Sequence, residues 1–131
     1  MHVLLIEDNA GDVLLIRQIL SRLPFSIKVS TALDGEQAVH LLADPEIKPD
    51  LIILDLNIPK IPGLTLLARY KPSTPVVVFS SSMNPDEVKR AMDLGVRQFV
   101  QKPLEIEEFT RAVIKIVEDS IGPKSTACGE P

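Results

Sequence analysis

The sequence predicts an α/β protein built on a doubly wound, five-stranded parallel sheet. Short apolar segments alternate with segments whose apolar residues recur at helical spacing, along nearly the whole chain. Such alternation is typical of βαβ units. The central apolar segment, residues 51–54, has no polar alternation, as expected for a strand covered on both faces. Right-handed crossovers, with two helices on one face and three on the other, then predict the strand order 2-1-3-4-5.

The composition disfavours several classes of protein. A chain of 131 residues fits one domain, and 45% hydrophobic with 24% charged residues is ordinary for a globular protein. A formal net charge of -4 and only 4% aromatic residues disfavour nucleic-acid binding. No apolar run is long enough to span a bilayer. The lone Cys128 and the lack of a signal sequence predict a cytoplasmic protein without disulfides.

Local signals set the bounds of the expected elements. Asn9 and Asn84 are expected to cap the first and fourth helices, and Gly95 to end the fourth in a left-handed conformation. Pro62 and Pro75 bracket the third helix and keep it short. The strands are expected at 2–6, 27–31, 51–54, 75–79 and 96–101. The helices are expected from 9 to about 22, from 34, over 64–70, from 84 to 95, and over 104–120.

The last helix carries an apolar stripe that is expected to face the sheet. Its members are Ile106, Phe109, Val113 and Ile116. Beyond the stripe the chain contains Pro, Gly and Ser, which disfavour packed structure near a terminus. Residues 1–121 are therefore expected to form the domain, and residues 122–131 a flexible tail.

Polar residues stand at the ends of four strands in an otherwise apolar sheet. They are Glu7, Asp8, Asp55, Ser80 and Lys102. Parallel strands end at one edge, where ligands bind in open α/β sheets. Because the order 2-1-3-4-5 places the first strand beside the third, Glu7, Asp8 and Asp55 are expected to share one crevice.

Several carboxylates in one crevice require a positive partner. Two like charges about 4 Å apart repel by roughly 4 kcal/mol at an effective dielectric near 20. Oxygen ligands without His or Cys select a hard divalent cation, and a few carboxylates with waters suit Mg²⁺. Lys102 supplies a second cation, Ser80 a hydroxyl, and Asp55 a carboxylate nucleophile. This set of groups is suited to stabilising a phosphoryl group during transfer.

The combined pattern resembles the receiver domain of two-component response regulators, which has a flavodoxin-like (βα)5 fold. The residues that carry the resemblance are Glu7, Asp8, Asp55, Leu56, Asn57, Ile58, Pro59, Ser80, Phe99, Lys102 and Pro103. It extends over residues 3–120. The stretches 7–13 and 55–60 are also similar to the stand-alone receivers associated with phytochrome-type histidine kinases.

The resemblance implies a role for each matching residue. Asp55 is the phosphoacceptor, and its donor is a phosphohistidine on a histidine kinase or a histidine phosphotransfer protein. Mg²⁺ is held by Asp8, Asp55, the backbone carbonyl of Asn57 and, through water, Glu7. Lys102 and the Ser80 hydroxyl contact the phosphoryl group. Phe99 follows Ser80 inward and changes a protein-contact surface. The resemblance therefore implies a signalling protein rather than an enzyme.

Further expectations concern the surroundings of the acceptor. Asn57, Ser81 and Ser82 flank the phosphoryl group, and their size and polarity are expected to control access of water. The resemblance implies a cis peptide bond between Lys102 and Pro103. It also implies a weak homodimer through the fourth helix, fifth strand and fifth helix. Since no effector module follows residue 120, a single-domain regulator acting through protein contacts is expected.

The sequence departs from the usual receiver pattern in three places. Ser80 stands where Thr is more usual, which keeps the hydroxyl, and Phe99 stands where Tyr is frequent. The short segment 62–75, bracketed by prolines, changes the expected shape of the third helix and any partner contact there.

Three other classes of protein share part of this pattern. An aspartate-nucleophile phosphatase of the haloacid-dehalogenase kind needs a second Asp two residues after the nucleophile, where Asn57 stands. A flavodoxin-like electron carrier needs a phosphate-binding loop after the first strand, where Glu7 and Asp8 would repel a phosphate. The remaining alternative is a degenerate receiver that binds partners without phosphorylation. The intact acidic pair, Asp55 and Lys102 argue against it.

Overall fold

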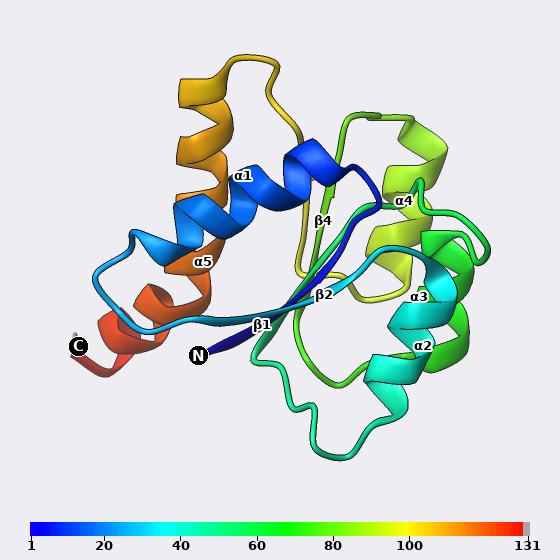
Figure 1. Cartoon of the computed structure of the whole chain (residues 1–131), viewed down its shortest axis with the longest axis horizontal. Coiled ribbons are helices and arrows are strands. Elements are labelled where there is room, and N and C mark those ends of the chain that lie inside the picture. The colour runs from blue at the N-terminus through cyan, green and yellow to red at the C-terminus, as the bar shows by residue number, and fades with distance from the viewer. Residues whose placement is uncertain (130–131) are drawn as a thin grey trace.

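The computed structural model describes the backbone of residues 1–129 and the side chains of residues 1–121. Five strands and five helices alternate along the chain (Figure 1). The strands are β1 (His2–Ile6), β2 (Lys28–Ala32), β3 (Leu51–Leu54), β4 (Val76–Ser80) and β5 (Gln98–Gln101). The helices are α1 (Ala10–Ser21), α2 (Gly35–Ala43), α3 (Gly63–Tyr70), α4 (Pro85–Asp93) and α5 (Ile106–Gly129). The strands are parallel in the order β2-β1-β3-β4-β5, which confirms the predicted fold class.

The sheet separates two apolar cores because successive strand residues point to opposite faces. Leu4 and Ile6 belong to the core beneath α2, α3 and α4, whereas Val3 and Leu5 belong to the core beneath α1 and α5. Figure 1 shows the same division, with α1 and α5 on one side of the sheet and the other helices opposite. All four residues of β3 are buried, as the absence of polar alternation predicted.

Strand register brings the two central strand ends together. Ile6 of β1 pairs with Leu54 of β3, so the next residues, Glu7 and Asp55, leave the sheet side by side. The ladder continues through them, because the Asp55 amide donates to the Ile6 carbonyl at 2.9 Å. At the other side of the site, the Lys102 amide donates to the Ser80 carbonyl at 2.7 Å and extends the β4 and β5 pairing.

The predicted caps Asn9 and Asn84 are present, because their side chains accept hydrogen bonds from backbone amides in the first turns of α1 and α4. Asp34 caps α2 in the same way. After α4, Gly95 has a φ of 94°, which confirms the predicted left-handed stop.

A close backbone contact determines where α3 begins. Gly63 donates its amide to the Leu56 carbonyl at 3.0 Å, and a Cβ at Gly63 would lie 2.7 Å from the Leu56 Cα. Only glycine lets the two backbones approach this closely. The contact closes the loop that follows Asp55 and gives that loop a defined shape.

The last helix differs from the prediction at both ends. It begins at Ile106, whose side chain is 65% exposed, so the expectation that Ile106 faces the sheet was wrong. Phe109 is the first buried residue of α5. The centroid of its ring lies 5.1 Å from the centroid of the Phe79 ring in β4. The helix also continues to Gly129, beyond the predicted end at Ser120. The division into a domain over 1–121 and a flexible tail over 122–131 stays a prediction, and residues 130–131 lie outside the described part.

Among the described residues, no helix is both long enough and apolar enough to cross a membrane.

Candidate acidic site at the carboxyl edge of the sheet

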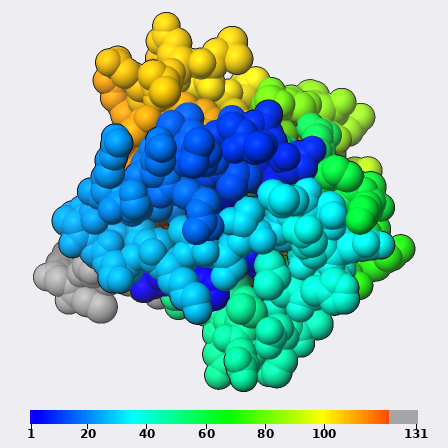
Figure 2. All heavy atoms as spheres, in the orientation of Figure 1, coloured from blue at the N-terminus to red at the C-terminus, as the bar shows by residue number. Residues whose placement is uncertain are grey.

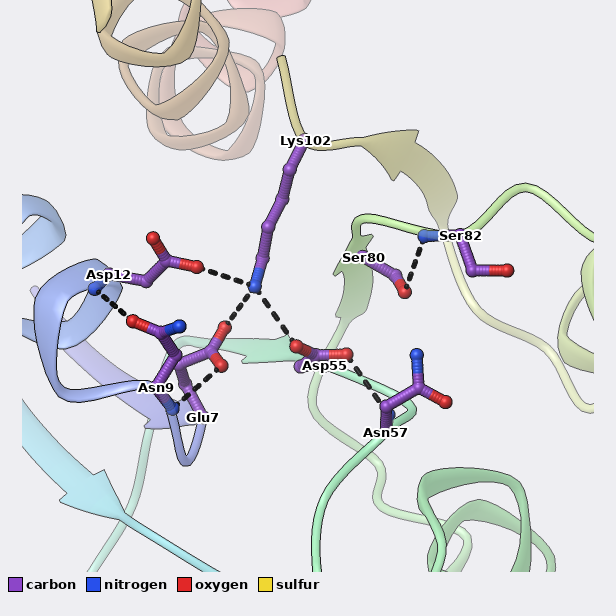
Figure 3. A network of polar contacts seen from close by, with 8 residues as sticks. All are labelled: Glu7, Asn9, Asp12, Asp55, Asn57, Ser80, Ser82 and Lys102. Carbon is purple, nitrogen blue, oxygen red and sulfur yellow. Dashed lines mark hydrogen bonds and ion pairs between the residues drawn. The ribbon is translucent and has the colours of Figure 1, made fainter. Parts of the chain in front are cut away.

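The Lys102 ammonium lies at the centre of the site and contacts three carboxylates (Figure 3). Its Nζ donates to Glu7 Oε1 at 2.6 Å, to Asp12 Oδ2 at 2.8 Å and to Asp55 Oδ2 at 3.0 Å. Lys102 follows β5, Glu7 follows β1, Asp55 follows β3, and Asp12 lies in the first turn of α1. The Lys102 side chain is only 8% exposed, so these ion pairs are largely shielded from water.

The two buried carboxylates are also held by the backbone. The Asn57 amide donates to Asp55 Oδ1 at 3.0 Å, and the Asn9 amide donates to Glu7 Oε2 at 3.1 Å. Each carboxylate therefore has one oxygen bound to a backbone N–H and the other bound to Lys102. This arrangement fixes the orientation of Glu7 and Asp55 without help from a bound ion.

Glu7, Asp8 and Asp55 form a group that suits a metal ion. One carboxylate oxygen from each lies within 4.8 Å of the others. Glu7 and Asp55 are buried, whereas Asp8 is exposed and leaves the group open to water. Ligands that are all oxygen fit Mg²⁺ or Mn²⁺, and access of water suits an ion that keeps part of its hydration shell.

The charge balance of the site also favours a cation. Three carboxylates, those of Glu7, Asp12 and Asp55, contact the Lys102 ammonium, and a fourth, that of Asp8, lies close to Glu7 and Asp55. Burial raises the pKa of Glu7 to about 7, and the charge of Asp55 acts in the same direction, although the hydrogen bond from Lys102 opposes both. Burial alone lowers the pKa of Lys102, but its hydrogen bonds to Asp12 and Glu7 outweigh this and raise that pKa above its usual value. Lys102 therefore remains a cation.

Figure 3 shows Asn57, Ser80 and Ser82 near Asp55, on the side away from Asp12. Ser80 is 1% exposed, and its Oγ accepts a hydrogen bond from the Ser82 amide at 3.3 Å. Asn57 and Ser81 are exposed, and Ser82 is half-buried. Phe99, on β5, is half-buried and packs against the core beneath α4. A small hydroxyl thus borders the acceptor, and an aromatic ring lies on the adjacent strand.

The expected cis bond before Pro103 was wrong, since the described residues contain no cis peptide bond. A trans bond is the ordinary lower-energy state of an X–Pro pair, by about 0.5–1 kcal/mol. With the trans bond, Lys102 still reaches all three carboxylates.

Asp12 is the residue of this site that sequence reasoning missed. The available signal was its place three residues after the cap Asn9, whose Oδ1 accepts the Asp12 amide at 2.9 Å. That position puts a carboxylate in the first turn of α1, at the same edge as the strand ends. Its contact with Lys102, 90 residues away in sequence, was not visible in any local pattern.

The parallel strands follow the order β2-β1-β3-β4-β5, and one edge of the sheet carries an acidic pair, a strand-end aspartate and a lysine. These features define a receiver-type α/β protein. The family model described as the response regulator receiver domain matches residues 3–114. The chain therefore belongs to the response regulator receiver domain family of two-component systems.

Several known proteins are similar to this chain. The probable methanogenesis regulatory protein FilR2 of Methanothrix harundinacea is 33% identical over 129 residues, which cover 92% of this chain and 83% of FilR2. The crystal structure of the phosphorylated cyanobacterial phytochrome response regulator RcpA has a TM-score of 0.82 and 34% identity. The Mn²⁺-bound form of the response regulator Rcp1 has a TM-score of 0.81 and 29% identity. Each structural match covers 89% of this chain and 91% of the other. Two further curated relatives are longer, and the chain spans 32% and 30% of their length.

Proposed function

We propose that this receiver accepts a phosphoryl group onto Asp55 from a phosphohistidine of a histidine kinase or histidine phosphotransfer protein. The observation that carries the proposal is the position of Asp55. Its carboxylate lies 3.0 Å from the Lys102 ammonium and shares a group of oxygens, within 4.8 Å of one another, with Glu7 and Asp8. This geometry combines a nucleophile with two places for positive charge, which phosphoryl transfer requires.

In the transfer, a carboxylate oxygen of Asp55 forms a bond to phosphorus while the bond from phosphorus to the histidine nitrogen breaks. The electron pair of that bond returns to the imidazole. Lys102 donates a hydrogen bond to a phosphoryl oxygen, and the Asn57 amide holds the aspartate in place. Mg²⁺, when bound by Asp8, Asp55, the Asn57 carbonyl and, through water, Glu7, would supply positive charge for the phosphoryl oxygens.

The signal then passes from Ser80 to the surface. The buried Ser80 hydroxyl turns from the Ser82 amide toward the phosphoryl group. Phe99, half-buried on the neighbouring strand, follows inward and changes the surface formed by α4, β5 and α5. A local electrostatic event thereby biases a two-state packing arrangement that a partner protein can read.

The proposal is tested by incubating the protein with Mg²⁺ and acetyl phosphate and measuring its intact mass. We expect a gain of one phosphoryl group in the wild type. The gain should disappear in Asp55→Asn and when EDTA replaces Mg²⁺. If the wild type gains nothing while its fold is intact, the protein is a degenerate receiver that binds partners without phosphorylation.

A further inference from the structure

The three contacts of Lys102 use the full donor capacity of its ammonium. A lysine ammonium has three N–H donors, and Glu7, Asp12 and Asp55 each accept one. Phosphorylation turns the Asp55 carboxylate into an acyl phosphate, whose negative charge lies on the phosphoryl oxygens. The donor that contacts Asp55 Oδ2 then passes to a phosphoryl oxygen, and a second donor can follow only if the contact with Glu7 or with Asp12 is weakened.

Burial distinguishes the two carboxylates that remain in the phosphorylated protein. The side chain of Glu7 is 2% exposed, whereas that of Asp12 is 27% exposed. Unpairing a buried charge is costly because water cannot replace the lost partner, but a partly exposed carboxylate can be rehydrated. The Asp12 contact is thus the least costly to break.

Asp12 can also leave Lys102 without disturbing α1. Its backbone amide is bound by Asn9 Oδ1 at 2.9 Å, so the helix cap does not depend on where the Asp12 carboxylate points. Figure 3 shows Asp12 and Asp55 on opposite sides of the Lys102 ammonium. Contact with Asp12 therefore competes with contact toward the acceptor.

We infer that Asp12 is a positioning residue that holds Lys102 in the unphosphorylated protein and releases it when Asp55 is phosphorylated. The inference rests on the proposed function. Asp12 stabilises the unphosphorylated state and adds negative charge near the incoming phosphoryl group. Both effects act against the phosphorylated state, so Asp12 lowers the fraction of protein that is phosphorylated at steady state.

The first experiment compares Asp12→Asn with the wild type in Mg²⁺ and acetyl phosphate. We expect the ratio of the phosphorylation rate to the hydrolysis rate to rise roughly twofold to fivefold, the range for a partly exposed ion pair. Asp12→Glu keeps the carboxylate and should return the ratio toward the wild-type value. Asp86→Asn is a matched control, since Asp86 lies in the first turn of α4 with its amide bound by Asn84 Oδ1 at 2.9 Å.

A second measurement follows the Lys102 ammonium by ¹⁵N NMR of the lysine side chain. Asp12→Asn should shift the Lys102 Nζ resonance strongly in the unphosphorylated protein and only weakly in the phosphorylated one. A helix-capping effect alone would not make the shift depend on phosphorylation.

The outcomes separate the two claims. If the wild type is phosphorylated but Asp12→Asn has an unchanged or lower ratio, or shifts the Lys102 resonance equally in both states, this inference is overturned and the proposed function stands. If the wild type takes up no phosphoryl group, the proposed function fails and the inference fails with it.

Discussion

The Lys102 ammonium lies 3.0 Å from the Asp55 carboxylate, although 47 residues separate them in the chain. The contact joins the end of β5 to the end of β3, across β4, which lies between them in the sheet. Because Lys102 also contacts Glu7 and Asp12, one side chain pairs with carboxylates from three elements of the fold. Removing that side chain should affect both stability and chemistry.

We predict that Lys102→Gln destabilises the metal-free protein by about 3 kcal/mol, because it leaves buried carboxylates without their cation. Urea unfolding at pH 8 in EDTA measures the change, and added Mg²⁺ should recover part of it. Lys115→Gln is the control, since Lys115 forms an exposed i,i+4 pair with Asp119 and should change little. Equal losses in the two variants would contradict the central role of Lys102.

A pH dependence follows from Glu7, whose pKa is raised from 4.5 to about 7 by burial. The folded state holds this proton more tightly than the unfolded state does. Its stabilising contribution is therefore complete below about pH 4.5 and is lost as pH rises through about 7. In EDTA, Glu7→Gln should gain stability relative to the wild type between pH 5 and pH 8, measured by urea unfolding. Glu118→Gln, an exposed change on α5, should show no such trend. If the stability difference between Glu7→Gln and the wild type does not change with pH, the prediction is refuted.

Gly63→Ala should disturb the loop that follows the acceptor. The new Cβ would lie 2.7 Å from the Leu56 Cα and 2.9 Å from Leu56 Cδ2, so the backbone must shift. We expect a loss of roughly 1–3 kcal/mol, typical of overpacking, and slower phosphorylation of Asp55. Arg69→Ala, an exposed change on the same helix, serves as control. If Gly63→Ala is phosphorylated at the wild-type rate, the shape of the loop that follows Asp55 does not matter for phosphorylation.

The phosphoryl lifetime should depend on access of water, because hydrolysis needs a water aligned with phosphorus. Ser82 is half-buried, and its amide donates to Ser80 Oγ at 3.3 Å. Replacing it with leucine should lengthen the lifetime at saturating Mg²⁺ and leave the Mg²⁺ midpoint unchanged. Ser73→Leu, in an exposed loop before β4, should leave both values alone. A lifetime that changes only together with Mg²⁺ binding would argue against control by water access.

A weak homodimer through α4, β5 and α5 stays a prediction. Val117 is fully buried and belongs to the core, whereas Ile114 is half-buried and Met92 of α4 is 46% exposed. Sedimentation velocity of the wild type should show association that increases with concentration. Ile114→Glu and Met92→Glu should each reduce it, with circular dichroism confirming that both are folded. A wild type that stays monomeric over the same range would rule the dimer out.

Local patterns determined most of the fold. Apolar runs without alternation, such as residues 51–54, and helix signals such as Asn84 and Gly95 act over a few residues, so they can be read directly from the sequence. The handedness of βαβ crossovers then determined the strand order. From that order alone, Glu7 and Asp55 were expected at one edge, and the register places them side by side.

Tertiary packing decided the details that depend on distance between elements. The Asp12 contact requires α1 to lie against the sheet at an angle that aims its first turn at Lys102, and no local pattern encodes that angle. Ile106 fits the apolar stripe but lies in the first turn of α5, before the helix reaches the sheet at Phe109. The sequence determined which groups reach the edge, and packing decided which carboxylates share the lysine.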